Sequence, residues 1–218
     1  MIELKNINKN FFENNLFTNF NYQFNIGQSY ALIGQSGCGK TTLLNIIGKL
    51  EAIDGGEVIV NNTSLNKIKE KEYFRSYVSY LFQNYGLIEN KSIKDNLELS
   101  FVGKNITSKE KIKKMLEALE QVNLNLDINR KIFSLSGGES QRVAIAKTIL
   151  KDTPIILADE PTGALDTETS VVIMDLLKEV AEDRLVIMVT HNPELAENYA
   201  NRIIRLRDGE VISDSNPY

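Results

Sequence analysis

The sequence predicts an α/β fold that is interrupted by a mostly helical insert. Short apolar runs typical of buried parallel strands occur at 29–33, 78–82, 155–158 and 185–190. Helical patterns separate several of these runs, and the stretch at about 85–149 is mostly helical in pattern. The chain of 218 residues suits one domain of two lobes, with ample length for a buried core.

The N-terminal part of the chain favours further strands. Apolar residues roughly alternate with polar ones at 2–7 and again at 20–24. Asn14-Asn15 favours a turn between these two runs, because asparagine is common in turns. Glycine and asparagine pairs bracket another strand at 57–60.

Helices are predicted at 41–47, ending at Gly48, and at 137–151 and about 167–182. Ser108 is expected to cap one more helix. The apolar positions of that helix are Ile112, Met115, Leu116 and Leu119. A hairpin turn at 207–210 is predicted to join strands at 203–206 and 211–212.

A glycine-rich loop at 34–41 matches the pattern G-x-x-x-x-G-K-[ST] between a predicted strand and a predicted helix. Its backbone N–H groups and the positive end of the helix are suited to a phosphate. Lys40 is expected to reach the β- and γ-phosphates, and Thr41 to offer its hydroxyl to Mg²⁺. The residues expected at the nucleotide are Gly34, Ser36, Gly37, Cys38, Gly39, Lys40, Thr41 and Thr42.

Cys38 is the one cysteine of the chain, so an internal disulfide is excluded. Two interpretations remain open for it. It is either a tolerated small residue at a variable loop position or a redox-sensitive thiol beside an anion site.

Two carboxylates follow the apolar strand at 155–158, where ligands bind in parallel sheets. Asp159 is suited to hold Mg²⁺, directly or through water. Glu160 is suited to polarise a water for attack on the γ-phosphate as a general base. Phosphoryl transfer needs mainly positioning and charge neutralisation, so these groups predict such chemistry.

Further motifs make the whole chain resemble the ATP-binding cassette (ABC) transporter ATPases. Leu135-Ser136-Gly137-Gly138-Glu139 resembles the LSGGQ signature, and 163–166 resembles the D-loop. The other matches are the Q-loop glutamine at Gln83, the switch histidine at His191 and, beside Phe12, the adenine-stacking aromatic at Phe11. With the phosphate loop and the acidic pair, these motifs follow the family's order from residue 11 to residue 191.

The resemblance implies a P-loop (RecA-like) nucleotide-binding core with an antiparallel β subdomain and an inserted α-helical subdomain. Residues 1–218 would form a single ABC ATPase domain. Residues 1–84 and 150–218 would form the core with the β subdomain, and 85–149 the helical signature subdomain.

The resemblance also implies a Mg-dependent ATPase that works as a head-to-tail homodimer. Ser136, Gly137 and Gly138 of one copy would meet the ATP that the other copy holds, and Asp166 of the D-loop belongs to the same nucleotide-binding set. By the same resemblance, Gln83 would bind Mg²⁺ or water, and His191 would contact the γ-phosphate and the attacking water. Phe11 would stack on adenine.

A net charge of −4 argues against general nucleic-acid binding. We also find no secretory signal and no apolar run of membrane-spanning length, so any membrane role is expected to be carried out from the surface through a partner. The resemblance implies that this partner is a separate transmembrane permease, which would hold the chain at the cytoplasmic face of the cell membrane. Residues 159–166 and the signature are similar to cassettes of the macrolide-export and lipoprotein-release type. Residues 82–90, where the permease's coupling helix is expected to dock, are similar to small Gram-positive cassettes of bacteriocin exporters.

Export of peptides, lipids or hydrophobic compounds is therefore the leading prediction. One alternative is an ABC ATPase that signals across the membrane to cell-wall enzymes or a sensor without moving cargo. A second is a soluble ATPase that acts on ribosomes or DNA, which predicts a second cassette or basic extensions.

Overall fold

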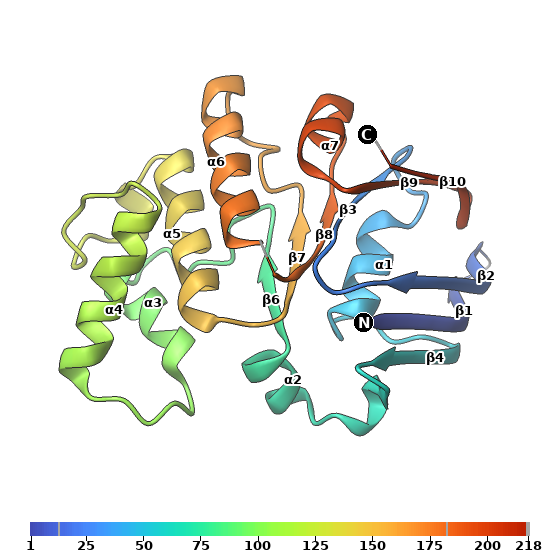
Figure 1. Cartoon of the computed structure of the whole chain (residues 1–218), viewed down its shortest axis with the longest axis horizontal. Helices are drawn as coiled ribbons and strands as arrows, with labels where there is room; N and C mark the ends of the chain where they lie inside the picture. Colours follow the sequence, from blue (N-terminus) through green and yellow to red (C-terminus); the bar gives the residue numbers. More distant parts are fainter. Residues whose placement is uncertain (13, 182, 217–218) are drawn as a thin grey trace.

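A computed structural model describes residues 1–12, 14–181 and 183–216. Its strands form a four-stranded and a six-stranded sheet. In Figure 1 the smaller sheet lies at the right, the larger sheet stands in the centre, and helix α4 (Ser108–Gln121) lies at the far left. No helix among these residues combines the length and the apolar character that a membrane crossing requires.

The larger sheet has the strand order β10-β9-β3-β8-β7-β6. Its strands are β3 (Ser29–Ile33), β6 (Val78–Leu81), β7 (Ile155–Asp159), β8 (Leu185–Val189), β9 (Arg202–Arg207) and β10 (Glu210–Ser215). The strands from β9 to β6 are parallel, and β10 is antiparallel to β9. The four predicted buried strands and the C-terminal hairpin are thus confirmed.

Both faces of this sheet are covered. Tyr30 and Leu32 of β3 pack with α1 (Lys40–Ile47) and the smaller sheet in one buried cluster. Ala31 and Ile33 belong to a second cluster on the other face, because successive strand residues point to opposite faces. That second cluster holds helices α5 (Gly137–Lys151), α6 (Thr167–Val180) and α7 (Pro193–Tyr199). Helices α1 and α5 therefore lie on opposite faces.

The smaller sheet has the order β2-β1-β4-β5. Its strands are β1 (Ile2–Phe11), β2 (Asn14–Phe24), β4 (Gly55–Val60) and β5 (Thr63–Ser64). The predicted turn at Asn14-Asn15 is wrong, because these residues begin β2 and pair with Phe11 and Asn10. The chain reverses earlier, where Phe12 has a left-handed φ of 53°, so the strand ladder extends through both asparagines.

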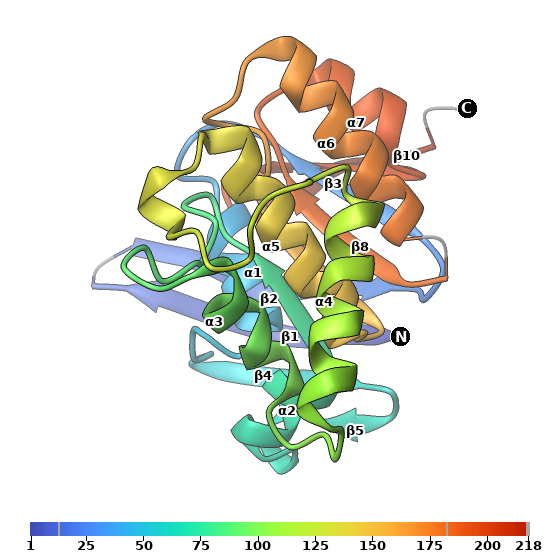
Figure 2. The ribbon, with the colours of Figure 1, turned by 90° about the vertical axis from the view of Figure 1, so that its left-hand side faces the viewer.

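In Figure 2 helices α3 (Ile93–Glu98), α4 and α5 face the viewer, and α2 (Glu70–Ser76) lies below them. Helix α5 spans the predicted residues, and α1 begins one residue before its predicted start. Helix α6 is described to Val180, and residue 182 of its predicted range lies outside the described residues.

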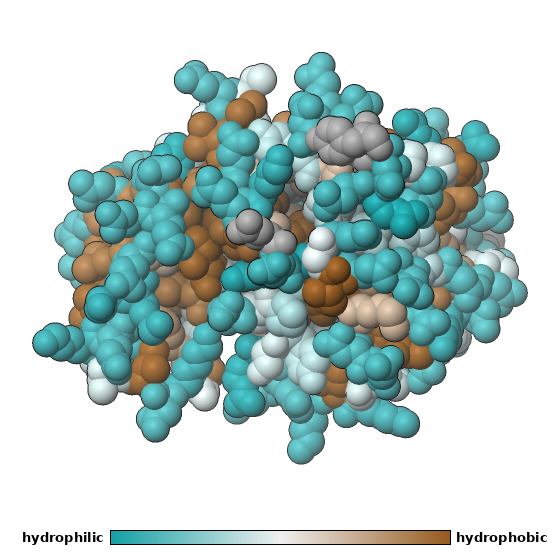
Figure 3. Space-filling view, viewed as in Figure 1, coloured by the Kyte–Doolittle hydropathy of each residue, from teal (hydrophilic) through white to brown (hydrophobic). Residues whose placement is uncertain are grey.

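The prediction for α4 was partly wrong. Thr107, rather than Ser108, caps the helix, because the Thr107 hydroxyl accepts from the Glu110 amide while Glu110 accepts from the Thr107 amide. Met115 and Leu119 are buried as predicted. Ile112 and Leu116 are 37% and 49% exposed, because the stripe that meets the neighbouring helices is centred on Met115. Figure 3 shows hydrophobic residues gathering over α4 and α5 on this otherwise mostly hydrophilic face.

Candidate nucleotide-binding site

The phosphate loop joins β3 to α1 at the edge where the parallel strands end. Gly39 is the N-cap of α1 and has a left-handed φ of 105°. A Cβ atom at Gly39 would lie 2.7 Å from Cζ of Phe17, so the position requires glycine. No side chain caps the helix, and its first turn carries no acidic residue. No carboxylate of the helix's own first turn therefore competes for the N-terminal N–H groups of α1, which suits an anion.

Lys40 is the first residue of α1 and is only 5% exposed. Its Nζ atom donates hydrogen bonds of 2.9 Å to the carbonyls of Gly34 and Gln35. The ammonium therefore lies over the loop that would surround a phosphate. Ser36 and Gly37 are exposed at this loop.

Cys38 is buried beneath the loop, with its Sγ atom 3.9 Å from Nζ of Lys40. It belongs to the cluster beside the smaller sheet. This burial favours the interpretation of Cys38 as a small packed residue.

Thr41 and Asp159 meet although they are 118 residues apart. The Thr41 hydroxyl donates to Oδ1 of Asp159 at 3.2 Å, where β7 ends. Burial raises the pKa of the Asp159 carboxyl, and the charge of Glu160 adds to that rise. The hydrogen bond from Thr41 and the charges of Lys40 and His191 act in the opposite direction. The site therefore holds a carboxylate that would gain from a nearby cation.

The side-chain oxygens of Thr41 and Asp159 are of the kind that binds Mg²⁺. Mg²⁺ is usually bound by one or two protein oxygens together with substrate phosphates and waters. Thr41 and Asp159 supply a hydroxyl and a carboxylate at adjacent positions. Gln83 is exposed shortly after β6, whose neighbour in the sheet is β7. Gln83 therefore lies at the same edge of the sheet as Asp159.

Glu160 and His191 also come together from separate loops. His191 Nε2 lies 2.9 Å from Oε1 of Glu160. Glu160 has a left-handed φ of 46°, and its amide donates to the carbonyl of Val189 at the end of β8. A left-handed backbone is uncommon for a residue other than glycine, so the surrounding contacts hold this carboxylate in a defined place.

A scan against family models matches residues 17–163 to the family described as ABC transporter. The chain belongs to the ABC transporter family. A macrolide export ATP-binding/permease protein, MacB of Campylobacter jejuni, is 38% identical over 99% of this chain, which spans 34% of that relative. The chain thus covers about a third of the MacB relatives that it matches. A phosphonates import ATP-binding protein of Fusobacterium nucleatum is 33% identical over 97% of this chain and 90% of its own length.

Solved ABC structures confirm the predicted fold class. The ATP-binding cassette MJ0796, solved as a dimer in a post-hydrolysis state bound to ADP and Pi, matches with a TM-score of 0.90. It is 36% identical, and the match covers 100% of this chain and 99% of that one. Both the fold and the family predicted from the motifs are therefore confirmed.

The ABC signature segment lies apart from the phosphate loop of its own chain. No hydrogen bond or ion pair links the two segments within 1–12, 14–181 and 183–216. Ser136 caps α5 and accepts from the Glu139 amide at 3.2 Å. Gly137 and Gly138 pack so closely that added Cβ atoms would lie 2.9 Å from Oη of Tyr85 and 2.8 Å from Cγ2 of Thr169.

Asp166 and Phe11 occupy the remaining predicted positions. Asp166 caps α6 and accepts from the Thr169 amide and hydroxyl. These hydrogen bonds lower the pKa of its carboxyl. Phe11 ends β1 and is 41% exposed.

Sequence reasoning missed several supporting residues. Tyr85 and Thr169 hold the signature glycines, and no local pattern marks them. Glu139 completes the cap of α5 by accepting from the Ser136 amide. The spacing Ser136-x-x-Glu139 is the known pattern of a capping box, so this contact was readable from the sequence.

Proposed function

We propose that this chain is the ATP-binding and ATP-hydrolysing subunit of an ABC transporter, with Mg²⁺ as its cofactor. The observation that carries the proposal is the meeting of three elements at one edge of the larger sheet. They are Lys40 over the phosphate loop, the Thr41–Asp159 contact and the Glu160–His191 pair. Family membership supports the same reading.

Triphosphate binding is assigned to the loop from Gly34 to Thr42. The uncapped start of α1 offers N–H groups, and Lys40 offers a charge. Thr41, Asp159 and Gln83 would hold Mg²⁺, which neutralises developing phosphate charge when bound. Phe11 would stack on the adenine ring.

Hydrolysis is assigned to Glu160 as the general base, with His191 beside it. The carboxylate would take a proton from the attacking water. The 2.9 Å contact lets His191 orient that carboxylate before it acts. His191 is exposed and follows β8, so it is open to the γ-phosphate side of the site.

A head-to-tail homodimer would complete each site. Ser136, Gly137 and Gly138 begin α5, on the opposite face of the sheet from α1. They would therefore bind the triphosphate of the other copy, and Asp166 would lie in the same interface. A dimeric relative with 36% identity supports this arrangement.

We further propose that a transmembrane permease binds the chain at the cytoplasmic face of the membrane and exports peptides, lipids or hydrophobic compounds. The MacB relatives, named as export proteins with a permease, support this. Residues 1–84 and 150–218 would be the core, and 85–149 the helical part.

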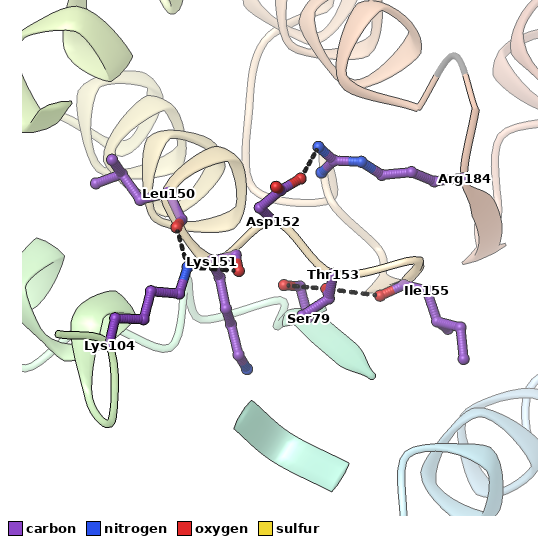
Figure 4. A network of polar contacts seen from close by, with 8 residues as sticks. All are labelled: Ser79, Lys104, Leu150, Lys151, Asp152, Thr153, Ile155 and Arg184. Carbon is purple, nitrogen blue, oxygen red and sulfur yellow. Dashed lines mark hydrogen bonds and ion pairs between the residues drawn. The ribbon is translucent and has the colours of Figure 1, made fainter. Parts of the chain in front are cut away.

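A groove between α2 and the end of α5 adds support for a docked partner. It adjoins the expected docking segment at 82–90, because its lining residue Lys147 donates to the carbonyl of Gly86. It has a volume of about 400 Å³ and presents the exposed apolar residues Leu99 and Val102. Lys147 and Lys151 also line it. Figure 4 shows the side chain of Lys151 pointing away from that of Lys104. The ammonium of Lys104 donates to the carbonyls of Leu150 and Lys151 at the end of α5.

The experiment that tests the proposal is Glu160→Gln. We expect ATP affinity, measured by calorimetry with Mg²⁺, to be retained while turnover falls about 100-fold or more. Glu120→Gln, on the exposed side of α4, is the matched control and should turn over normally. Normal hydrolysis by the Glu160→Gln protein would show that the base is assigned wrongly.

A further inference from the structure

Lys9 is a buried charge outside the phosphate loop. Among the described residues, Lys9 and Lys40 are the two charged residues that are buried, at 7% and 5% exposed. Lys40 is explained by the nucleotide site. In the described part of the chain, the side-chain hydrogen bond and ion pair of Lys9 go to Glu51 and not to a residue assigned to the phosphates, Mg²⁺ or the attacking water. A buried charge is costly unless it is paired and hydrogen-bonded. Its partners therefore indicate what it does.

The ammonium of Lys9 lies between a carboxylate and an aromatic ring. Its Nζ atom is 2.5 Å from Oε1 of Glu51 and 4.6 Å from the centroid of the Phe11 ring. This distance is within the range of a cation–π contact. Lys9 is buried and Phe11 is 41% exposed. The ammonium therefore lies over one face of the ring while part of Phe11 stays open to solvent.

Two further hydrogen bonds join the end of β1 to Asp54. The Asn10 amide donates to Oδ2 of Asp54 at 2.6 Å, and the Asp54 amide donates to the Asn8 carbonyl at 2.9 Å. Glu51 and Asp54 both lie in the connector from α1 to β4. The helix that begins at the phosphate loop thus ends in the segment that fixes Phe11.

We propose that Lys9 is a positioning residue for the nucleotide base. Held by Glu51, its ammonium fixes the Phe11 ring at a set place relative to the phosphate loop, so that the adenine ring of ATP stacks on the open part of the ring. This inference rests on the proposed function, in which Phe11 receives adenine. Lys9 acts through Phe11 and does not itself contact ATP.

The test uses Lys9→Met, which removes the charge and keeps the length of the side chain. We expect the Kd for ATP, measured by calorimetry with Mg²⁺, to rise about three- to tenfold. The KM for ATP should rise by a similar factor, and kcat should not change. The Kd for tripolyphosphate, which lacks a base, should also stay unchanged.

Two further variants separate positioning from folding. Phe11→Leu should weaken ATP by at least as much as Lys9→Met, and adding Lys9→Met to it should have no further effect. Lys5→Met removes an exposed ion pair of the same strand, with Glu3, and should change neither affinity. If the Lys9→Met chain does not fold, the Lys9→Met, Glu51→Gln double variant removes both charges of the pair and provides the same test.

The outcomes are distinguishable. Equal losses of ATP and tripolyphosphate affinity, or an undiminished effect of Lys9→Met in the Phe11→Leu chain, would show that Lys9 only supports the fold. Unchanged ATP affinity in the Lys9→Met chain would also overturn the inference. If Phe11→Leu has no effect on ATP, both the stacking role and this inference are wrong, while the Glu160→Gln result still decides the ATPase assignment.

Discussion

Helices α1 and α5 both begin at glycine-rich motifs, but their N-termini are built differently. Helix α1 begins at Gly39 with no side-chain cap and no acid in its first turn. Helix α5 begins with a complete capping box, in which Ser136 and Glu139 bind each other's amides. The N-terminus of α1 is therefore open, because no side chain caps it. The N-terminus of α5 is closed, because Ser136 and Glu139 of the same chain cap it.

This difference gives the two helix ends unequal affinity for phosphate. The N-terminus of a helix attracts anions, and the Glu139 carboxylate already supplies one at α5. Ser136 can still donate its hydroxyl hydrogen while its oxygen accepts from Glu139. We therefore expect α1 to bind ATP in a single chain, and α5 to bind only a phosphate that a second copy presents.

The largest expected effect comes from the open end. Lys40→Met removes the ammonium that lies over the phosphate loop. We expect turnover to fall about 100-fold or more, because a preorganised charge near the phosphate is lost. ATP affinity, measured by calorimetry, should fall as well. Unimpaired ATP binding would place the nucleotide elsewhere.

The closed end should respond in two ways. Ser136→Ala removes a cap and should destabilise the fold by about 1 kcal/mol. It should also lower turnover about tenfold, because a hydrogen bond to a charged phosphate is lost. Thr107→Ala removes the equivalent cap of α4 and serves as the control. It should cost similar stability in urea unfolding and leave turnover unchanged; equal turnover in both variants would make Ser136 a structural cap only.

A smaller effect is expected from the charge at α5. Glu139→Gln keeps an oxygen for the Ser136 amide and removes the negative charge. We expect the ATP concentration at half-maximal turnover to fall about two- to fivefold, because the helix end then repels the partner's phosphate less. Glu110→Gln makes the same change at α4 and should have no effect. A rise for Glu139→Gln would mean that the carboxylate assists the site.

The smallest effect lies at the other end of α5. Burial, with the charges of Lys147 and Lys104, lowers the pKa of Lys151 to about 8. Between about pH 8 and the ordinary lysine pKa, the unfolded chain binds more protons than the folded chain, so stability should rise with pH in that window. Lys151→Met should raise the melting temperature at pH 7 and flatten this rise. An unchanged slope would show that Lys151 does not titrate there.

Much of the site could be predicted because its motifs are local or end on parallel strands. The loop pattern fixed the positions of Lys40 and Thr41, and the strand-end rule brought Asp159 and Glu160 to the same edge. His191 was expected at the site from its match to the family's switch histidine, and it follows β8, which pairs with β7. The structure brings Thr41 to Asp159 and Glu160 to His191, contacts that were not predicted as pairs.

Other features depend on contacts that no local pattern reveals. Nothing in the sequence predicts a carboxylate partner for Lys9, which is buried and paired with Glu51 of the connector from α1. Leu116 is apolar, as core residues are, but its side chain is turned away from the core.

The cap of α4, in contrast, could have been predicted from the sequence. Thr107 has Glu110 at the capping-box spacing, and Ser108 has no such partner.

The most direct test of the shared site is the mass of the Glu160→Gln chain in solution, measured by light scattering with ATP and Mg²⁺. We predict twice the mass of one chain with ATP and the mass of one chain without it. The Glu160→Gln, Ser136→Arg double variant should have the mass of one chain although it still binds ATP. A single-chain mass for ATP-loaded Glu160→Gln, or a dimer that Ser136→Arg leaves intact, would contradict the shared site.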